Sequence, residues 1–521
     1  RLVIASRADP LLPLPRLRAG GQMLELRADD LRFSLDEAAD FLGRFMQVEL
    51  SFEDFAALEA RTEGWAAGLQ MAGLSLRGRQ DGSAFIRAFS GSNRYILDYL
   101  TEEVFNRSSE QIRLFLLHTS ITDRFCPALC EALAGDEIKP LTVQTMLAEL
   151  EQANLFLIPL DEDGLWYRYH HLMLDLLRMR LMQIEPAKQA ALHRRAAHWF
   201  KARLDEKWDS SLASEAIRHA LAGGDVALAE MVMEKSWDGW AYAGEINTAL
   251  RWLKAMPETV RRANPYLSGL LAWSYYLSGI ASEADEPLEQ AELAMLQRLE
   301  QGLFAADSVE HRNILSLILA LRALLARGRG DVQASLSLAQ QAVNITPPQN
   351  LFMLSIAYTS LGNALRESGD YHAALPVYEK SIEMLLKVRN MLALGSMTLY
   401  YQRMLAAMGN LRPALEAGKT ILARVEAAGL QQSPGLTYVM AGIGDLLYEL
   451  NELDEAENFA NDGVKLARRG GILDGIKQNS IVLARIFTAR NEKERALELL
   501  NSVEQEILIS GGTLSRVDLK A

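Results

Sequence analysis

Along most of the chain, apolar residues recur at every third or fourth position, with polar and charged residues between them. This spacing gathers the apolar side chains on one face of an α-helix, so it predicts helices almost throughout. The segment "SLDEAADFLGRF" also carries a helix start, because Ser34 followed three residues later by Glu37 forms a capping box. The predicted fold class is therefore predominantly all-α.

Two stretches follow a strand pattern instead. Residues 2–5 are consecutive apolar residues and predict a buried strand, which needs neighbouring strands to be stable. Further along, "NLFLIPL" and "LWYRYH" are strand-like runs separated by the turn "DEDG" at 161–164, which predicts a β-hairpin.

The order of elements around this hairpin indicates a winged helix. Several helices lead into a single hairpin, which then opens into a further helix. In winged helices that read DNA, the recognition helix carries basic residues. Here that helix has only Arg178 and Arg180, at its far end. The pattern favours a structural or regulatory winged helix over one that reads DNA.

Beyond residue 185 a helical motif repeats. A turn of Gly or Asn plus a polar residue precedes a helix with a small residue on its inner face, as in "ESGDYHAALPVYEKSI" and "ELNELDEAENFANDGV". A period of roughly 40 residues predicts stacked helical hairpins that form a superhelix with a concave surface. We expect a superhelix after about residue 215, related to tetratricopeptide repeats but with a longer period. The small positions are Ser335, Ala374, Ala414, Ala456 and Ala496, with earlier copies at Ala229 and Ala284.

Length and charge limit the possible functions. With 521 residues the chain is too long for one hydrophobic core, and roughly three domains are expected. The 54 basic residues are outnumbered by 67 acidic ones, giving a net charge of -13, which argues against nucleic-acid binding through the overall field. The uncharged stretch 263–282 is as long as a membrane span, but its Asn, Pro, Gly and Ser residues indicate a packed helix.

Motifs of catalytic and metal sites are absent from the sequence. There is no G-x-x-x-x-G-K-[ST], H-E-x-x-H, G-x-S-x-G or C-x-x-C. Cys126 and Cys130 give no disulfide framework and suggest a reducing compartment, the cytoplasm. The histidines at 170–198 would need to converge from two segments to bind zinc. We therefore expect neither an enzyme active site nor a metal site.

Aromatic residues concentrate between 237 and 276, where four tryptophans and four tyrosines occur. Such a group either fills the core of wide early repeats or offers a platform on which a planar ligand stacks. Both interpretations remain open. The candidate ligand-binding residues are Trp240, Tyr242, Trp252, Trp273 and Tyr276.

Several stretches together resemble the MalT-type regulators, ATP-dependent bacterial transcription activators of the STAND class of signalling ATPases. They are the opening 42 residues, "RTEGWAAGLQMAGLSLRG", "YRYHHLMLDLLRMRL" and "ALRWLKAMPETVRRANPYL". The family combines a nucleotide-binding domain, a winged helix, a helical-repeat sensor and a LuxR-type helix-turn-helix. In it, ATP and an inducer together drive self-association, and the oligomer activates promoters.

The resemblance implies four regions. They are the C-terminal part of an α/β nucleotide-binding domain (1–90), a winged helix (91–184), a helical linker (185–225) and a TPR-like sensor (226–521). The phosphate-binding loop and the helix-turn-helix would lie outside this sequence, so the chain is expected to be a fragment.

The implied partners follow from the same layout. They are a small-molecule inducer, other copies of the parent protein, and DNA only through the missing domain, with no membrane. The intact parent would be a slow signalling ATPase that binds ATP or ADP with Mg, whereas this chain alone would bind nucleotide weakly.

The resemblance also assigns nucleotide-binding roles to individual residues. Arg7 stands where the class has a sensor arginine for the γ-phosphate. Gly64, Trp65 and Ala66 match a Gly-x-Pro motif that packs beside adenine, with Ala66 in place of the proline. His170 matches the histidine of the Met-His-Asp motif, which holds the ADP β-phosphate in the resting state. A second histidine replaces the aspartate of that motif.

A second class of function competes with this one, namely a helical-repeat scaffold for protein–protein interactions without nucleotide switching. For a scaffold the amino-terminal stretches would be irrelevant. The predicted strand at 2–5 favours the regulator, because a pure scaffold has no use for it.

Overall fold

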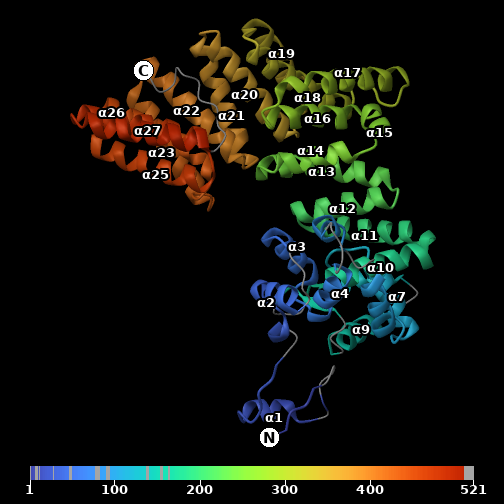
Figure 1. The fold of residues 1–521 in the computed structure, drawn as a ribbon. Helices are drawn as coiled ribbons and strands as arrows, with labels where there is room; N and C mark the ends of the chain where they lie inside the picture. The colour runs from blue at the N-terminus through green and yellow to red at the C-terminus, as the bar shows by residue number, and fades with distance from the viewer. Residues whose placement is uncertain are drawn as a thin grey trace. The chain divides into compact units, whose positions relative to one another are not determined.

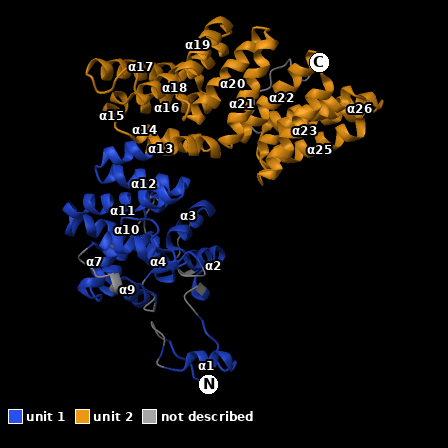
Figure 2. Ribbon diagram, turned by 180° about the vertical axis from the view of Figure 1, so that it is seen from behind, with its two compact units in different colours: residues 1–232 blue, residues 233–521 orange. Residues whose placement is uncertain are grey.

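The computed structural model describes residues 2–5, 10, 12–26, 29–45, 50–76, 82–89, 94–135, 140–152, 156–161 and 165–509. The chain forms two compact units, residues 1–232 and residues 233–521 (Figure 2). Both consist mainly of helices (Figure 1), which confirms the predicted all-α class. In the described ranges, β-structure is limited to one two-stranded sheet and one isolated bridge.

Residues 2–5 do not form the predicted strand. Leu2 is 82% exposed and Val3 is 91% exposed. No strand lies beside them within the described ranges, so their backbone groups have no ladder to join. The prediction was wrong because an apolar run forms a strand only where a neighbouring strand pairs with it.

In the region up to residue 105, the helix that follows Ser34 begins where the sequence predicts. The Ser34 hydroxyl accepts the N–H of Glu37 at 3.3 Å, and the Glu37 carboxylate accepts the N–H of Ser34 at 2.9 Å, which confirms the capping box. The helices of this region are α1 (Leu14–Ala19), α2 (Leu35–Asp40), α3 (Phe52–Thr62), α4 (Ala66–Leu76), α5 (Gly82–Ala88) and α6 (Arg94–Leu100). Single turns of 3-10 or π-helix cover Asp29–Leu31, Phe41–Phe45 and Thr101–Phe105.

The winged helix contains the predicted hairpin. Strand β1 (Leu157–Pro159) pairs antiparallel with β2 (Tyr167–Tyr169), with Leu157 opposite Tyr169. The carboxylate of Asp161 accepts the N–H of Leu165 at 2.7 Å. Helices before the hairpin are α7 (Glu110–Thr119), α8 (Pro127–Ala134) and α9 (Pro140–Gln152), and α10 (His171–Ile184) follows it.

Three long helices follow the winged helix. In this region the His193 and His219 rings lie with their Nδ1 atoms 2.7 Å apart, and the ring of His219 stacks on the buried ring of Phe200. Burial and the neighbouring His219 lower the pKa of His193 to about 4, so His193 is neutral at pH 7. Burial lowers the pKa of His219 as well. The helices are α11 (Pro186–Glu206), α12 (Ser210–Ala222) and α13 (Val226–Ala243).

Helical hairpins build the second unit, as the repeat predicts. Every predicted small position on the inner face of a second helix is buried, and Ala374, Ala414 and Ala456 are 0% exposed. The turn before each of these helices has a residue with positive φ, which Gly and Asn tolerate best. Those residues are Gly330, Gly369, Gly409, Asn451 and Asn491.

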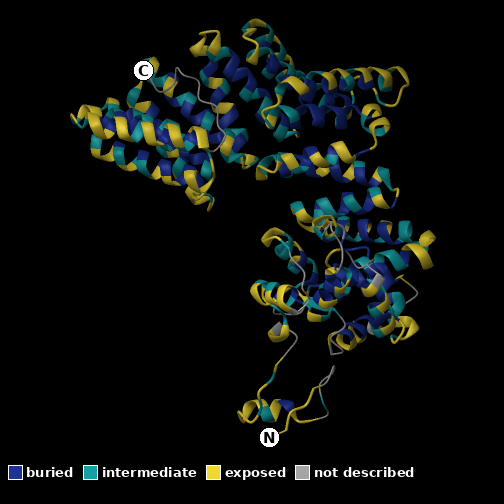
Figure 3. Cartoon of the chain, viewed as in Figure 1, coloured by how far each residue is buried: buried dark blue, intermediate teal, exposed yellow. Residues whose placement is uncertain are grey.

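Helices of the second unit pack mainly on their sequence neighbours, with exposed residues along one side and buried residues along the other (Figure 3). None in the described ranges is long and apolar enough to cross a membrane. The early helices are α14 (Ile246–Ala255), α15 (Glu258–Ala263), α16 (Pro265–Leu277) and α17 (Asp285–Glu300). The five regular hairpins are α18 (Val309–Gly328) with α19 (Val332–Ile345), α20 (Leu351–Glu367) with α21 (Tyr371–Lys387), α22 (Met391–Ala407) with α23 (Leu411–Ala427), α24 (Thr437–Glu449) with α25 (Leu453–Arg469), and α26 (Leu473–Ala489) with α27 (Lys493–Ile509).

Candidate functional site

The candidate site is the junction in the first unit where the wing hairpin meets the end of α3. Helix α3 stops at Thr62, and Glu63 and Gly64 both adopt left-handed backbone conformations with φ of 50° and 69°. The carbonyl of Gly64 accepts the N–H of Phe33 at 2.8 Å. A Cβ on Gly64 would stand 2.4 Å from the carbonyl oxygen of Phe33, so this turn requires glycine.

Glu63 is the centre of the junction. Arg168 on β2 donates two parallel hydrogen bonds to its carboxylate, at 2.8 and 2.9 Å. The backbone N–H of His171 donates a third at 3.2 Å, and the Arg32 guanidinium lies 3.4 Å away. A fork of this kind is the strongest ion-pair geometry available to a carboxylate. It ties the wing to the turn after α3.

The electrostatics of Glu63 follow from these contacts. Burial by itself raises the pKa of its carboxyl, since its side chain is only 9% exposed. The hydrogen bonds and the charge of Arg168, together with the backbone N–H of His171, act the other way and lower the pKa to about 2. Glu63 is therefore ionised at any physiological pH.

His170 faces the same turn from the other chain segment. Strand β2 ends one residue earlier than predicted, so His170 is the N-cap of α10, and its Nδ1 accepts the N–H of Leu172 at 3.3 Å. Its Nε2 donates to the carbonyl of Thr62 at 2.8 Å. One nitrogen accepts and the other donates, so the ring is neutral. Burial lowers the pKa of His170, and the nearby Glu63 opposes this only in part.

The two neighbours of His170 lie in different surroundings. Tyr169 points into the winged-helix core, where its hydroxyl lies 2.7 Å from that of Thr119. His171 is exposed and its Nδ1 lies 3.3 Å from the Glu63 carboxylate. Only His170 of the pair is buried against the segment that resembles a nucleotide-binding domain.

Trp65 completes the junction with its aromatic ring. The ring packs edge-on to Phe156 at 5.0 Å and to His170 at 6.0 Å between centroids. It also covers Gly68, where a Cβ would stand 2.6 Å from the indole. Ala66 begins α4 beside it and is exposed.

The structure thus brings together Gly64, Trp65 and His170, three of the predicted nucleotide-binding residues. Arg7 lies outside the described residues. Sequence reasoning did not single out Glu63 or Arg168. In the sequence, Glu63 and Arg168 are marked only by their opposite charges, each within a stretch that resembles the family. The two residues are 105 positions apart, and no pattern in the sequence indicates that they are in contact.

The aromatic residues predicted to bind a ligand lie in the second unit. Trp240 and Trp273 are buried, and the indole N–H of Trp273 donates to the carbonyl of Leu317 at 3.0 Å. Tyr242 packs on Phe352 at 5.2 Å. Trp252 and Tyr276 are half-buried. Most of this group serves as core, and a ligand role for the partly exposed members stays a prediction.

Both cysteines of the chain belong to helix α8 or its N-cap, and their thiols are free. Cys130 is buried and Cys126 is half-buried, and neither forms a disulfide. Among the described residues, no group of three or more His, Cys, Asp or Glu side chains is arranged to hold a metal ion.

Matches to family models and to whole proteins both indicate that this chain is similar to MalT-like regulators. A model of the MalT winged helix domain matches residues 101–189, and a model of the MalT-like TPR region matches residues 317–508. The HTH-type transcriptional regulator MalT of Serratia proteamaculans is 28% identical over 470 residues, which are 89% of this chain and 50% of that protein. The serine/threonine-protein kinase PknK of Mycobacterium tuberculosis is 29% identical over 512 residues, 96% of this chain and 44% of that protein.

The fold has a solved counterpart. The crystal structure of a STAND protein with a tetratricopeptide repeat sensor from Pyrococcus horikoshii covers 92% of this chain with a TM-score of 0.54 and 14% identity. At that identity the likeness concerns the fold alone. The chain spans about half the length of the curated relatives it matches.

Proposed function

Because this chain is a MalT-like regulatory region, with a winged helix ahead of a TPR array, we propose that it is the signal-sensing part of an ATP-dependent bacterial transcription activator. In this proposal an inducer binds the helical repeats. The inducer and the nucleotide state of the parent protein together control self-association. DNA binding belongs to a LuxR-type domain of the parent, which acts in the cytoplasm.

The observation that carries this proposal is the Glu63 junction. It joins the winged helix to the segment that resembles the end of a nucleotide-binding domain through buried and charged contacts. Such a contact forms or breaks as a whole, because a buried charge that loses its partner is strongly destabilising. An all-or-none junction is what a nucleotide-controlled switch needs.

The residues at the junction fit one end of a nucleotide and lack a phosphate cradle. Trp65 supplies an aromatic ring that packs on Phe156 and His170, Gly64 and Ala66 adjoin it, and His170 has a single N–H donor. That donor is engaged with Thr62, so a phosphate contact requires His170 to exchange one acceptor for the other. The exchange is favourable because a phosphate is a stronger, charged acceptor. Arg7 is proposed to sense the γ-phosphate.

A scaffold without nucleotide switching is the competing proposal. The strand that was predicted to separate the two does not form, so it no longer discriminates between them. The Glu63 junction takes its place, since it fixes the winged helix to the segment that resembles a nucleotide-binding domain, and a scaffold needs neither of these two parts. The similarity to PknK adds no catalytic role, because it covers less than half of that kinase.

The test of the proposal is His170→Ala in the intact parent protein, beside His171→Ala. We expect the first variant alone to bind ADP more weakly and to activate transcription without inducer. A hydrogen bond to a charged group is worth about 1.5–3 kcal/mol, so ADP affinity should fall ~10- to 150-fold. Equal effects of both substitutions, or none, would contradict the role of His170.

A further inference from the structure

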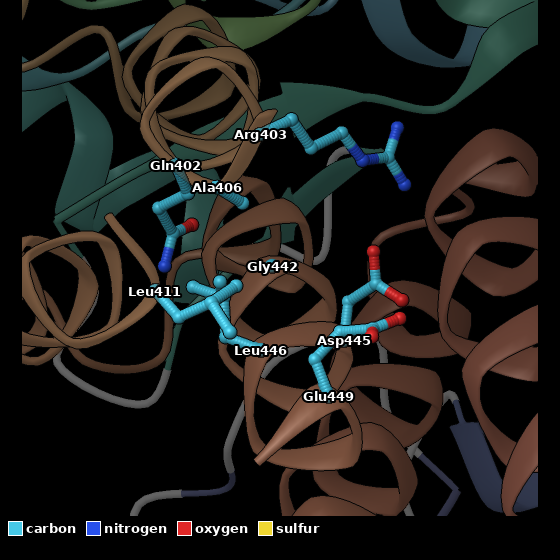
Figure 4. A pocket seen from close by; sticks show the side chains of 8 residues that line it. All are labelled: Gln402, Arg403, Ala406, Leu411, Gly442, Asp445, Leu446 and Glu449. Carbon is cyan, nitrogen blue, oxygen red and sulfur yellow. The ribbon is translucent and has the colours of Figure 1, made fainter. Parts of the chain in front are cut away.

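The second unit contains a cavity of about 290 Å³ between α22, α23 and α24 (Figure 4). Leu411 and Leu446 form an apolar wall, and Ala406 lies beside them. Arg403 and Asp445 stand on the opposite side (Figure 4). At roughly 30 Å³ per water molecule, this volume suits a ligand of about ten non-hydrogen atoms. Most aromatic side chains at 237–276 pack into the core of the unit, whereas this cavity contains no side chain and can hold a ligand.

A buried amide lines the cavity. Gln402 on α22 is 0% exposed and its side chain lies between two glycines of neighbouring helices. A Cβ on Gly418 would stand 2.2 Å from its Nε2, and a Cβ on Gly442 would stand 2.1 Å from its Oε1. Both helices therefore leave room for this side chain, since a residue larger than glycine at either position would overlap its amide.

One atom of that amide has no partner. Nε2 donates a long hydrogen bond to the carbonyl of Ala414 at 3.5 Å, but Oε1 has no hydrogen-bond partner among the described residues. Buried acceptors in native proteins are almost always bonded, because an unbonded one loses its hydration without replacement. The Oε1 of Gln402 is thus an unsatisfied hydrogen-bond acceptor on a residue that lines the cavity.

Charges at the rim cancel. Asp445 and Glu449 both accept hydrogen bonds from Arg485, and Arg403 adds a second cation on the same side. Two carboxylates and two guanidinium groups leave no net charge to attract an ion. Arg403 also donates to the side-chain oxygen of Gln478 at 2.8 Å, so each of these charged groups already has a partner that a charged ligand would have to displace. The carboxylates keep lone pairs that accept from neutral N–H or O–H groups.

We propose that this cavity binds a small, uncharged hydrogen-bond donor, a hydroxylated or amide compound, whose donor bonds the Oε1 of Gln402. Its carbon frame packs on Leu411 and Leu446, and its remaining donors bond the rim carboxylates. The further assignment of this ligand as the inducer rests on the proposed function. The site is distinct from the aromatic group predicted from the sequence.

The test uses the whole 521-residue chain and simple probes. Erythritol and propionamide are uncharged donors, while propionate and propylammonium carry charge and N,N-dimethylpropionamide has no donor. Saturation-transfer NMR should detect binding of the first two, and at least tenfold weaker binding of the other three. Equal binding of the charged or donor-free probes, or no binding of any uncharged donor, overturns the proposal.

Two variants locate the bound probe. Gln402→Leu removes the amide, and we expect binding to fall at least tenfold while the melting temperature stays equal or rises, since an unbonded acceptor is lost. Ala406→Phe fills the cavity and should block binding. Ala407→Phe, one residue further along α22 and exposed, is the matched control and should bind as the parent chain does. Unchanged binding in Gln402→Leu places the probe elsewhere and refutes the site.

The same variants separate this inference from the proposed function. An inducer that drives self-association of the parent protein equally well with Gln402→Leu refutes the assignment of this cavity as the inducer site and leaves the proposed function of the chain intact. Probe binding that depends on Gln402 without any effect on self-association supports the cavity and refutes its regulatory role.

Discussion

At the scale of single residues, Glu63 is the residue whose replacement we expect to lower the stability of the fold most. Its pKa is about 2 in the folded protein, against an ordinary value of 4.5, and its side chain is largely buried. A carboxyl with a lowered folded pKa stabilises the fold above its unfolded pKa, and this stabilisation disappears as the pH falls through the folded pKa. The window for Glu63 therefore runs from about pH 5 down to about pH 2.

We predict that Glu63→Gln lowers the free energy of unfolding by about 3 kcal/mol at pH 7, which is the energy of the difference between the two pKa values. The loss should shrink towards pH 2, where Glu63 itself becomes protonated. Chemical denaturation of both proteins at pH 7, 5 and 3 measures this. Glu206→Gln, at an exposed position of α11, is the control and should change little. Equal free energies of unfolding for Glu63→Gln and the parent chain at all three pH values would show that the Glu63–Arg168 fork does not stabilise the fold.

Gly64 is the second residue whose replacement we expect to be severe. In Gly64→Ala the left-handed backbone is strained and the new methyl group overlaps the Phe33 carbonyl. Together these effects should destabilise the first unit by at least about 2 kcal/mol, measured by chemical denaturation. Gly224→Ala is the control, since it has the same strain, with φ of 72°, and no atom within 4 Å of the new Cβ. Equal destabilisation by Gly64→Ala and Gly224→Ala would mean that the backbone at Phe33 shifts to accommodate the new methyl group.

The sequence located this site only in part. It predicted His170 and the Gly64–Ala66 segment, because family motifs mark them. It did not predict Glu63, Arg168 or Thr62, because a side-chain contact between distant segments leaves no local periodicity. The one-residue error at His170 has the same origin, since its role as a helix cap depends on where the strand ends in three dimensions.

At the scale of elements, prediction succeeded where one segment determines its own structure. Helix caps, the β-hairpin and the small positions of the repeat are local features, and each is confirmed. The strand at 2–5 failed because a strand depends on partners that its own residues do not specify. The structural role of the aromatic group also depended on packing, which buried Trp240 and Trp273.

We predict that Ala374→Leu and Ala456→Leu each destabilise the second unit by about 1–3 kcal/mol, because both alanines are fully enclosed between paired helices and cannot accommodate added volume. Thermal denaturation checks this. Ala407→Leu is the control, since Ala407 is exposed on the same array. If the two buried variants melt at the temperature of the parent chain, the inner face of the repeat has been assigned to the wrong positions.

At the scale of the whole molecule, the chain should act through binding rather than catalysis. We predict that the purified chain neither hydrolyses ATP nor binds DNA specifically, because it has no phosphate-binding loop in its sequence and carries a net charge of -13. Phosphate release and fluorescence anisotropy with labelled duplexes measure the two activities. ATP turnover that a point substitution within these 521 residues abolishes would overturn this prediction.

The stacking of the second unit has a mechanical consequence. Each hairpin of the array packs mainly on its neighbours along the sequence, so a small rotation at every joint adds up along the array. Such an assembly behaves like a spring, which extends under tension by many slight turns before any single hairpin is pulled apart. A molecule held between α22 and α24 would stiffen one joint of that spring, and optical-trap stretching would register it as a shorter extension at the same force.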